Sequence, residues 1–325
     1  MKILITGAAG FIGSHLTDRF IADGHSVVAV DNLSMGKYEN ISQHEDNERF
    51  EFHKLDILEY GEFRKVSDNC EIIVHLAAFK IPRYGNAIDT LVINNQGTVN
   101  VLKLARELNA KTLVASTSDV YGKNPALPFS EESDLVIGPS SRPRWSYAVS
   151  KMYDEHICLA SMEAYGFPVV LLRFFGSYGP RHHLSWWGGP QSVFIDKILE
   201  REEIPIHGDG KQTRSFTYIS DTIEGLAQAT YSDKANGEIL NIGATREITI
   251  VDLAKLIHSL MPDAPELKLK FIPYEDISKG YEDVMRRIPD DSKIKRLLGV
   301  SANIPLEEGL KKTIEWQISV RKNMT

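Results

Sequence analysis

Tyr147 and Lys151 are the pair of side chains in this sequence best suited to proton transfer. They stand four residues apart in the stretch Tyr-Ala-Val-Ser-Lys, and side chains with this spacing share one face of a helix. Because an ammonium stabilises a phenolate, Lys151 is expected to lower the pKa of Tyr147 and make it a general base for a hydroxyl group. Such pairs are more often solvated than catalytic, but Thr117 follows a predicted central strand, where open parallel sheets bind their ligands.

A glycine-rich segment, Gly7-Ala-Ala-Gly10-Phe-Ile-Gly13, joins the first predicted strand to the helix that follows it. Glycines at this spacing allow a tight turn, a close approach of the backbone to a pyrophosphate and close packing of helix on strand. The helix N-terminus adds free N–H groups and a partial positive charge. Asp31 ends the second predicted strand, where its carboxylate can accept hydrogen bonds from ribose hydroxyls and repel a 2′-phosphate. The segment predicts a dinucleotide site selective for NAD over NADP.

Short apolar segments alternate with longer helical stretches along the first half of the chain. They are near-continuous runs of Val, Ile and Leu, as expected of parallel strands that are buried on both faces. The predicted strands are Ile3–Thr6, Val27–Asp31, Phe50–His53, Ile72–Leu76, Thr112–Ser116 and Val169–Arg173. The predicted helices are Ile88–Leu108, Ser146–Tyr165 and one that carries Leu253–Leu260, with Thr249 as its N-cap. This alternation predicts an α/β fold with a Rossmann-type, doubly wound parallel sheet.

The character of the sequence changes after about residue 175, where loops lengthen, proline and glycine become more frequent and the elements shorten. We expect residues 1–175 to form the NAD-binding domain, which would also carry Thr117, Tyr147 and Lys151. Residues 176–325 are expected to form a smaller α/β C-terminal lobe that binds the substrate.

Composition narrows the function classes. The 325 residues have a formal charge of −7 and no basic run, which argues against a nucleic-acid partner. No apolar run approaches the roughly 18 residues of a membrane helix, and the N-terminus does not fit a secretory signal, so a cytoplasmic location is expected. Cys70 and Cys158 fit reduced core thiols. Because His182 and His183 have no third ligand at a telling distance, we expect pocket lining or a dimer contact there rather than a metal site.

Five segments together resemble those of the extended short-chain dehydrogenases/reductases, and specifically the NAD-dependent nucleotide-sugar epimerase/dehydratase family. They are TGAAGFIG at the N-terminus, HLAA over 75–78, TSDVYG over 117–122, YAVSK over 147–151 and QTRSFTY over 212–218. The resemblance extends from residue 1 to about residue 318, and the order and spacing of the segments agree. It implies an enzyme whose bound NAD is reduced by the substrate and reoxidised before release. It also implies a UDP-linked nucleotide sugar as substrate, and a homodimer formed through helices that include the one carrying Tyr147.

The resemblance also assigns residues to both ligands. For NAD, in addition to Asp31, it implies Gly7, Gly10, Phe11, Ile12, Gly13, Asn32, Leu33, Ser34, Gly36, Asp56, Ile57, Leu76, Ala77, Ala78, Lys80, Asn94, Tyr147, Lys151 and Phe175. For the nucleotide sugar it implies Thr117, with Arg214 and Arg287 on the pyrophosphate, a role that suits a bidentate guanidinium. Gly176 departs from the family, in which Asn commonly follows the Phe.

Members of this family differ in chemistry at the triplet that is Thr117-Ser118-Asp119 here. Dehydratases resemble Thr-Asp-Glu, and Ser118 replaces their acid, so 4,6-dehydration is disfavoured. Nucleotide-hexuronate decarboxylases resemble Thr-Ser-Glu, one methylene longer than this triplet, and the stretch RPRWSYAVSK over 142–151 is similar to theirs. Lys80 instead matches a lysine of the 4-epimerases that the decarboxylases lack.

These features favour a 4-epimerase that works through a transient 4-keto sugar, with Asp119 as a further catalytic residue. A UDP-glucuronate decarboxylase is the main alternative. A hypothesis of a different class is a non-catalytic NAD-binding protein. Relatives of that kind typically lose the Tyr or the Lys, whereas Thr117, Tyr147 and Lys151 are all present here.

Overall fold

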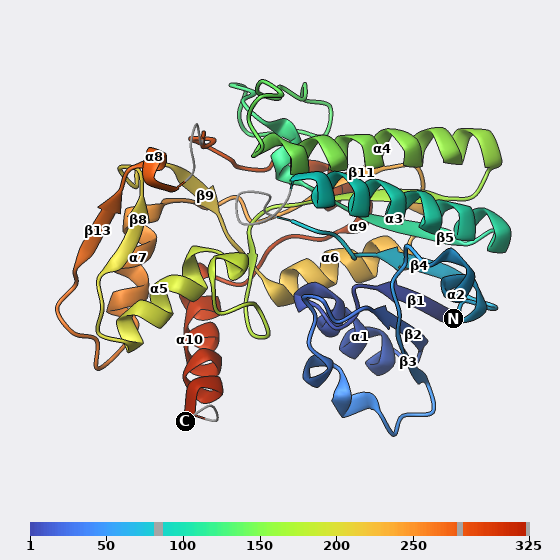
Figure 1. The fold of residues 1–325 in the computed structure, drawn as a ribbon, viewed down its shortest axis with the longest axis horizontal. Coiled ribbons are helices and arrows are strands. Elements are labelled where there is room, and N and C mark those ends of the chain that lie inside the picture. The colour runs from blue at the N-terminus through green and yellow to red at the C-terminus, as the bar shows by residue number, and fades with distance from the viewer. Residues whose placement is uncertain (81–86, 278–281, 323–325) are drawn as a thin grey trace.

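A seven-stranded parallel sheet lies between two layers of helices in the computed structural model, which describes residues 1–80, 87–277 and 282–322 (Figure 1). The order of the strands is β11-β6-β5-β4-β1-β2-β3. They are β1 (Lys2–Thr6), β2 (Ser26–Asp31), β3 (Phe50–Lys54), β4 (Ile72–His75), β5 (Lys111–Thr117), β6 (Val169–Phe174) and β11 (Ile239–Ile242). The six strands expected from the sequence are confirmed, and their ends differ from the expected ones by a residue at most.

Successive residues of the central strands face opposite helical layers, and both sets are apolar. In β1, Ile3 and Ile5 pack in the core that includes Leu16 of helix α1 (Phe11–Ala22), whereas Leu4 packs in the core that includes Val101 of helix α3 (Ala87–Leu108). All three strand residues are fully buried, and burial of such a side chain contributes roughly 1.5–3 kcal/mol. This two-sided burial is the physical reason for the uninterrupted apolar runs.

The helices of the two layers come from different parts of the chain. One face of the sheet is covered by α1 (Phe11–Ala22) and α6 (Ile219–Tyr231), and the other by α2 (Tyr60–Lys65), α3 (Ala87–Leu108) and α4 (Trp145–Tyr165) (Figure 1). The expected helices over α3 and α4 are confirmed. None of the helices within the described ranges is long and apolar enough to cross a membrane.

The chain returns to the sheet after its first 175 residues. Strand β11 pairs in parallel with β6, and α6 packs beside α1, where Arg19 Nη1 lies 2.6 Å from Glu224 Oε2. The second half of the sequence therefore contributes a strand to the central sheet and a helix to the layer that contains α1. A single division of the chain at residue 175 does not separate the sheet from the smaller lobe. The assignment of one ligand to each part stays a prediction.

The smaller lobe is built from short strand pairs and helices (Figure 1). The remaining elements are β7 (Ser177–Tyr178), α5 (Pro190–Leu199), β8 (Ile204–His207), β9 (Thr213–Ser215), β10 (Thr217–Tyr218), β12 (Glu247–Thr249), α7 (Ile250–Ser259), β13 (Leu269–Ile272), α8 (Tyr274–Ile277), α9 (Ser292–Leu298) and α10 (Leu306–Lys322). The expected N-cap of α7 is confirmed, because Thr249 Oγ1 accepts a hydrogen bond from Asp252 N at 3.0 Å.

The order of the strands determines where a ligand can bind. After β3 the chain crosses to the far side of β1 and continues as β4. Open parallel sheets form a crevice at such a switch point, beyond the carboxyl ends of the strands. The loops after β1, β4, β5 and β6 meet there, and these loops carry the glycine-rich segment, the HLAA segment, Thr117 and Phe175.

His75, the last residue of β4, is buried among hydroxyl groups. Its Nδ1 lies 2.7 Å from Thr6 Oγ1 and its Nε2 lies 3.2 Å from Thr98 Oγ1, on α3. Burial, and to a smaller extent the nearby charge of Lys151, lowers the pKa of His75 to about 3. The folded protein therefore keeps this imidazole neutral across the ordinary pH range.

This neutral histidine should make the stability of the protein depend on pH. In the unfolded chain its pKa is about 6.5, so below that pH the unfolded state binds a proton that the folded state excludes until about pH 3. The free energy of unfolding should therefore fall as the pH falls from 6.5 toward 3, by about 1.4 kcal/mol per pH unit for this proton. In denaturant titrations at pH 7 and pH 5, His75→Gln should lose less stability between the two pH values than the unmodified protein. Equal losses in both proteins would contradict this account.

Candidate active site

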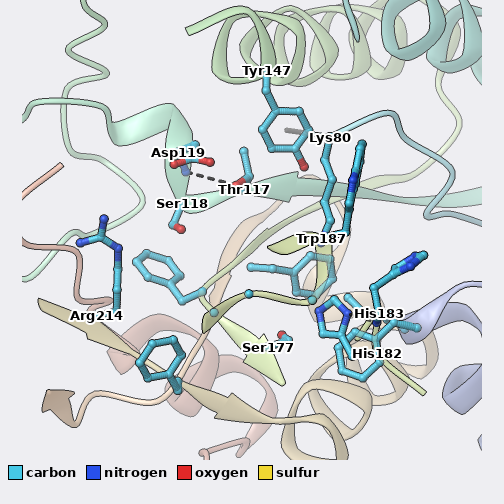
Figure 2. A pocket seen from close by; sticks show the side chains of 18 of the residues that line it. Lys80, Thr117, Ser118, Asp119, Tyr147, Ser177, His182, His183, Trp187 and Arg214 are labelled. Carbon is cyan, nitrogen blue, oxygen red and sulfur yellow. Dashed lines mark hydrogen bonds between the residues drawn. The ribbon is translucent and has the colours of Figure 1, made fainter. Parts of the chain in front are cut away.

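A pocket of about 490 Å³ opens at the carboxyl ends of β1, β4, β5 and β6, between the sheet and the smaller lobe (Figure 2). The expected site residues that line it are Gly7, Gly10, Phe11, Ile12, Gly13, Leu76, Ala78, Lys80, Thr117, Asp119, Tyr147, Lys151, Phe175, Arg214 and Arg287. The expected site residues outside its lining are Asp31, Asn32, Leu33, Ser34, Gly36, Asp56, Ile57, Ala77 and Asn94. The structure thus brings the motifs of both halves of the chain to one cavity.

The glycine-rich segment forms the floor of the pocket beneath the first turn of α1. A Cβ atom on Gly13 would lie only 2.2 Å from the carbonyl oxygen of Gly7, so any side chain there would push α1 away from β1. Gly10, at the N-cap position of α1, provides no side chain that would occupy the N-terminal N–H groups. This open cradle at a helix N-terminus fits the pyrophosphate of a dinucleotide.

Asp31 and Asp56 lie beside the pocket at the ends of β2 and β3. Asp31 Oδ2 accepts a hydrogen bond from Ala9 N at 3.0 Å, and its Oδ1 accepts one from Leu33 N at 2.8 Å. Burial raises the pKa of Asp31, and these two N–H groups oppose that effect. Asp56 Oδ2 accepts a hydrogen bond from Asn32 Nδ2 at 3.0 Å. Both carboxylates therefore order the loops at this edge, and their contacts with a cofactor stay predictions.

Asn94 uses its buried amide to hold the loop that leads to Lys80. Its Oδ1 accepts a hydrogen bond from Phe79 N at 2.7 Å, and its Nδ2 donates to Phe79 O at 3.1 Å. The same Nδ2 donates to Ser150 Oγ on α4 at 3.0 Å. Asn94 thus positions the pocket wall, and its expected contact with the dinucleotide stays a prediction.

Thr117 and Tyr147 meet on one wall of the pocket, where the Tyr147 ring extends from α4 toward Thr117 (Figure 2). Thr117 Oγ1 accepts a hydrogen bond from Asp119 N at 3.2 Å and thereby caps the short 3-10 helix Ser118–Tyr121. The pKa of Tyr147 lies above its ordinary value, first because of burial and then because of the charges of Asp119 and Asp154. A hydrogen bond with Thr117 and the charge of Arg287 oppose this rise.

Lys151, which was expected to lower the pKa of Tyr147, is paired with a carboxylate in this structure, so its effect on the phenol stays a prediction. Its Nζ lies 3.1 Å from Asp154 Oδ2, and both side chains are only 1% exposed. The carboxylate neutralises the charge that was expected to act on the phenol. Asp154 was not identified from the sequence, although it lies three residues after Lys151 on the same helical face.

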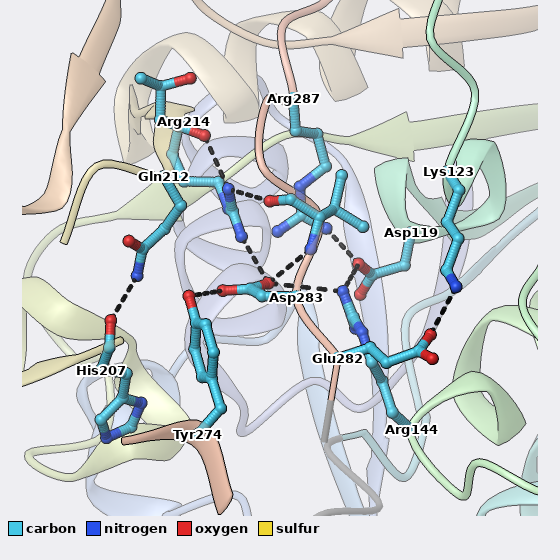
Figure 3. A network of polar contacts seen from close by, with 12 residues as sticks. Asp119, Lys123, Arg144, His207, Gln212, Arg214, Tyr274, Glu282, Asp283 and Arg287 are labelled. Carbon is cyan, nitrogen blue, oxygen red and sulfur yellow. Dashed lines mark hydrogen bonds and ion pairs between the residues drawn. The ribbon is translucent and has the colours of Figure 1, made fainter. Parts of the chain in front are cut away.

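Three arginines and two aspartates form a polar cluster at the other end of the pocket (Figure 3). Arg214 Nη2 donates to Asp283 Oδ1 at 2.7 Å, and Arg287 Nη1 pairs with Asp119 Oδ1. Arg144 Nη2 lies 3.6 Å from Asp283 Oδ1 and 4.0 Å from Asp119 Oδ1. The three guanidinium groups exceed the two carboxylates by one positive charge, which suits an anionic ligand such as a diphosphate.

Asp283 holds the arginines of this cluster in place. Burial alone would raise the pKa of its carboxyl, but the charges of Arg214, Arg144 and Arg287 outweigh burial and lower it. Arg144 and Asp283 were not assigned roles from the sequence. Arg144 lies in the segment RPRWSYAVSK, whose similarity to the decarboxylases could have indicated it. Asp283 lies in a loop segment with no recognisable pattern.

Lys80 and the loop with the two histidines form the remaining wall (Figure 2). Burial lowers the pKa of Lys80 to about 8, against the opposing charge of Asp119. The His182 ring stacks on Phe11 at 4.1 Å between centroids, and burial, then Lys80 and His183, lower the pKa of His182 far below its usual range. Across residues 1–80, 87–277 and 282–322, no group of three or more His, Cys, Asp and Glu side chains could hold a metal ion.

Gly176, the departure from the family pattern, is explained by its backbone. Its φ is +48°, and a Cβ there would lie 2.4 Å from the carbonyl oxygen of Ser215. An Asn at this position would force β9 away from the pocket. Residue 176 therefore lines the pocket without presenting a side chain to it.

The comparisons with known proteins agree with this geometry. The model of the NAD-dependent epimerase/dehydratase family matches residues 3–243, and the chain belongs to this family. It is 37% identical over 318 residues to a UDP-N-acetyl-α-D-glucosaminuronate decarboxylase of Bacillus cytotoxicus, covering 97% of each chain. It is 39% identical over 317 residues to UDP-glucuronic acid decarboxylase 1 of Xenopus tropicalis, covering 97% of this chain and 72% of that one.

Solved structures include a UDP-glucuronic acid 4-epimerase of Bacillus cereus, in complex with UDP-glucuronic acid and NAD. It is 30% identical, with a TM-score of 0.88, and the match covers 98% of this chain and 100% of that one. The family assignment inferred from the motifs is therefore confirmed, as is NAD as cofactor. Some of these relatives are named as decarboxylases and another as a 4-epimerase, so the comparisons leave the reaction of this chain open.

Asp31 should make the protein selective for NAD, because its carboxylate would meet the 2′-phosphate of NADP at close range. Asp31→Ala should weaken NAD binding about 10- to 100-fold, the usual cost of losing hydrogen bonds to a charged group. The ratio of the dissociation constant for NADP to that for NAD should become smaller. Dissociation constants for both cofactors, measured by calorimetry, test this. Tighter binding of NADP than of NAD by the unmodified protein would disprove the role of Asp31.

Proposed function

We propose that this protein is a NAD-dependent decarboxylase of a UDP-linked hexuronate. The observation that carries the proposal is Asp119, a carboxylate in the pocket wall that acts on the pKa of Tyr147 on one side and pairs with Arg287 on the other. Such a pair lies beside Tyr147, the proton-transfer residue. Its cationic side can bind an anionic group of a substrate, and its acidic side can take part in proton transfer.

The first half of the reaction uses Thr117 and Tyr147. Thr117 can bind the C4 hydroxyl of the sugar, and Tyr147 can take its proton as a general base. NAD⁺ bound beside these residues would supply the hydride acceptor, and later the hydride donor, for C4. Thr117 and Arg287 favour the phenolate of Tyr147, and burial disfavours it.

The second half uses Asp119 and a neighbouring arginine. A ketone at C4 lies β to the C6 carboxylate of a hexuronate, so the C5–C6 bond can break and release carbon dioxide. The electron pair left on C5 then takes up a proton that comes from water, and the Asp119 carboxylate, which faces the pocket, can orient that water and relay its proton. Arg144 can hold the substrate carboxylate before it leaves, while Arg214 and Arg287 keep their expected place on the diphosphate, and Tyr147 returns its proton to O4 at the end.

The similarity to decarboxylases supports this proposal. The relatives from Bacillus cytotoxicus and Xenopus tropicalis are both named as hexuronate decarboxylases and are more similar in sequence than the solved 4-epimerase. Asp119 differs from the Glu typical of decarboxylases by one methylene, and its pairing with Arg287 keeps its carboxylate on the pocket wall.

A 4-epimerase, which the sequence favoured, is the second candidate and stays a prediction. Lys80 supports it, because this residue matches a lysine of the 4-epimerases and lines the pocket. A 4-keto sugar would have to rotate in the site and take the hydride back on its other face. A short carboxylate at residue 119 would leave more room for that rotation than a Glu.

The products of defined substrates separate the two candidates. UDP-glucuronate, UDP-N-acetylglucosaminuronate and UDP-glucose should each be incubated with the NAD-loaded protein and followed by NMR. We expect a uronate to yield a UDP-pentose or UDP-N-acetylpentosamine with release of carbon dioxide, and UDP-glucose to remain unchanged. Asp119→Asn should slow formation of the pentose product about 10²-fold or more, because the carboxylate that relays the proton to C5 is lost.

Two variants serve as controls for this assay. Tyr147→Phe should slow formation of every product by roughly 10²–10⁴-fold, and Asp119→Glu should retain decarboxylation. A six-carbon 4-epimer as the main product would overturn the decarboxylase proposal in favour of the second candidate. Bound NAD without conversion of any nucleotide sugar would favour the non-catalytic hypothesis.

We also propose that the protein forms a homodimer through α3 and α4, as the family resemblance implies. These adjacent helices expose apolar side chains one turn apart, namely Ile88 and Val92 on α3 and Val149 and Tyr153 on α4. Exposed apolar side chains clustered on one face are typical of protein–protein contacts.

Charge introduced on this face should separate the subunits. The variant Val92→Asp, Tyr153→Glu should elute as a monomer in light-scattering chromatography at a concentration where the unmodified protein is a dimer. Phe271→Glu is the matched control, since Phe271 is 53% exposed, comparable to Val92 at 54%, but lies on β13 in the smaller lobe. A dimer that survives the double substitution would show that the interface lies elsewhere.

A further inference from the structure

A buried polar network connects the glycine-rich segment with Lys151. Thr6, at the end of β1, accepts a hydrogen bond from Ala77 N at 3.3 Å and contacts His75, whose other ring nitrogen contacts Thr98. Thr98 in turn faces Asp154: burial raises the pKa of this carboxyl, and Lys151 and the Thr98 hydroxyl oppose that rise. The chain of contacts ends at the ion pair between Asp154 and Lys151.

Lys151 is the only charged member of this network that also lines the pocket among the residues the structure describes. A buried ammonium is stable only when a carboxylate offsets its loss of hydration, and Asp154 is that carboxylate at 3.1 Å. Neither side chain has room to exchange this partner for water, because both are 1% exposed. The position of the lysine in the pocket therefore depends on Asp154.

We propose that Asp154 is a positioning residue of this active site: its carboxylate holds Lys151 in place, and its negative charge offsets the charge of that lysine at the Tyr147 phenol. The inference rests on the proposed role of Tyr147 as the proton acceptor. It explains why Lys151, although one turn from Tyr147, does not act as an unopposed cation on the phenol.

Other charged groups around this pair are accounted for. The groups that face Asp154 are Lys151 and Glu155 on α4, with His75 beside Lys151 on β4 and the thiol of Cys158 next to Asp154. Glu155 is engaged by Arg173, whose Nη2 lies 2.7 Å from Glu155 Oε2, and His75 is neutral. The charges that act on Tyr147 are those of Asp119, Asp154 and Arg287. Removing Asp154 thus changes one charge of that set.

The test is to follow the titration of Tyr147 itself. The NAD-loaded protein is labelled with tyrosine carrying ¹³C at Cζ, and the Tyr147 signal is identified by its absence in Tyr147→Phe. In Asp154→Asn the apparent pKa of Tyr147 should fall by on the order of one unit, as expected for the loss of one nearby charge. This corresponds to about tenfold more phenolate at a fixed pH below the pKa. The low-pH limb of the kcat profile should move to lower pH by the same amount.

Glu155→Gln is the matched control, because it breaks a neighbouring buried ion pair on the same helix but leaves the Lys151 pair intact. It should lower the melting temperature without moving the Tyr147 titration, whereas Asp154→Glu should retain a titration near that of the unmodified protein. If Asp154→Asn does not fold, Asp154→Ala provides the second variant. Because it also removes the negative charge, it should shift Tyr147 in the same direction.

The outcomes separate this inference from the proposed function. An unchanged Tyr147 titration in Asp154→Asn, or in Asp154→Ala where Asp154→Asn does not fold, would overturn the inference even if the protein decarboxylates a hexuronate. A shift equal to that of Glu155→Gln would also overturn it, since it would report only a structural disturbance. A shifted titration in a protein that converts no nucleotide sugar would support the charge balance while the proposed function fails.

Discussion

The close packing of α1 on the end of β1 is the constraint on which the pocket depends. Gly13 permits it, because a Cβ there would lie 2.2 Å from the carbonyl oxygen of Gly7. With α1 in this position, its N-terminal turn faces the crevice at the switch point between β1 and β4. The pocket floor, the stacking of His182 on Phe11 and the approach of the smaller lobe all follow from that placement.

Charge balance organises the walls above this floor. Lys151 is balanced by Asp154, Arg214 by Asp283, and Arg287 by Asp119. Buried ions need such partners, since the loss of hydration would otherwise exceed what the fold can supply. An anionic substrate that enters the pocket would have to compete with the carboxylates that already hold the arginines, and ligands that offer several oxygens at once would compete best.

The local features of the fold were predicted well because they depend on neighbouring residues. The strands around Ile3–Thr6 and Val169–Arg173 were recognised from apolar runs, and the α7 N-cap from Thr249 and Asp252. Strand β11 was not predicted, since its four residues resemble many short apolar segments and only its pairing with β6 identifies it. The ion pair between Lys151 and Asp154 was not predicted, because the charge of Asp154 was not considered.

The sequence by itself determined the family, the cofactor class and the residue types that meet in the pocket, because motif spacing and hydrophobic period are local properties of the chain. The tertiary structure alone decided which charges face one another. Asp119 meets Arg287 and Arg214 meets Asp283 across long stretches of sequence, and His75 meets Thr6 and Thr98 only when β1, β4 and α3 pack together. Such pairings follow from the packing of sheet, helices and smaller lobe, and no spacing along the chain specifies them.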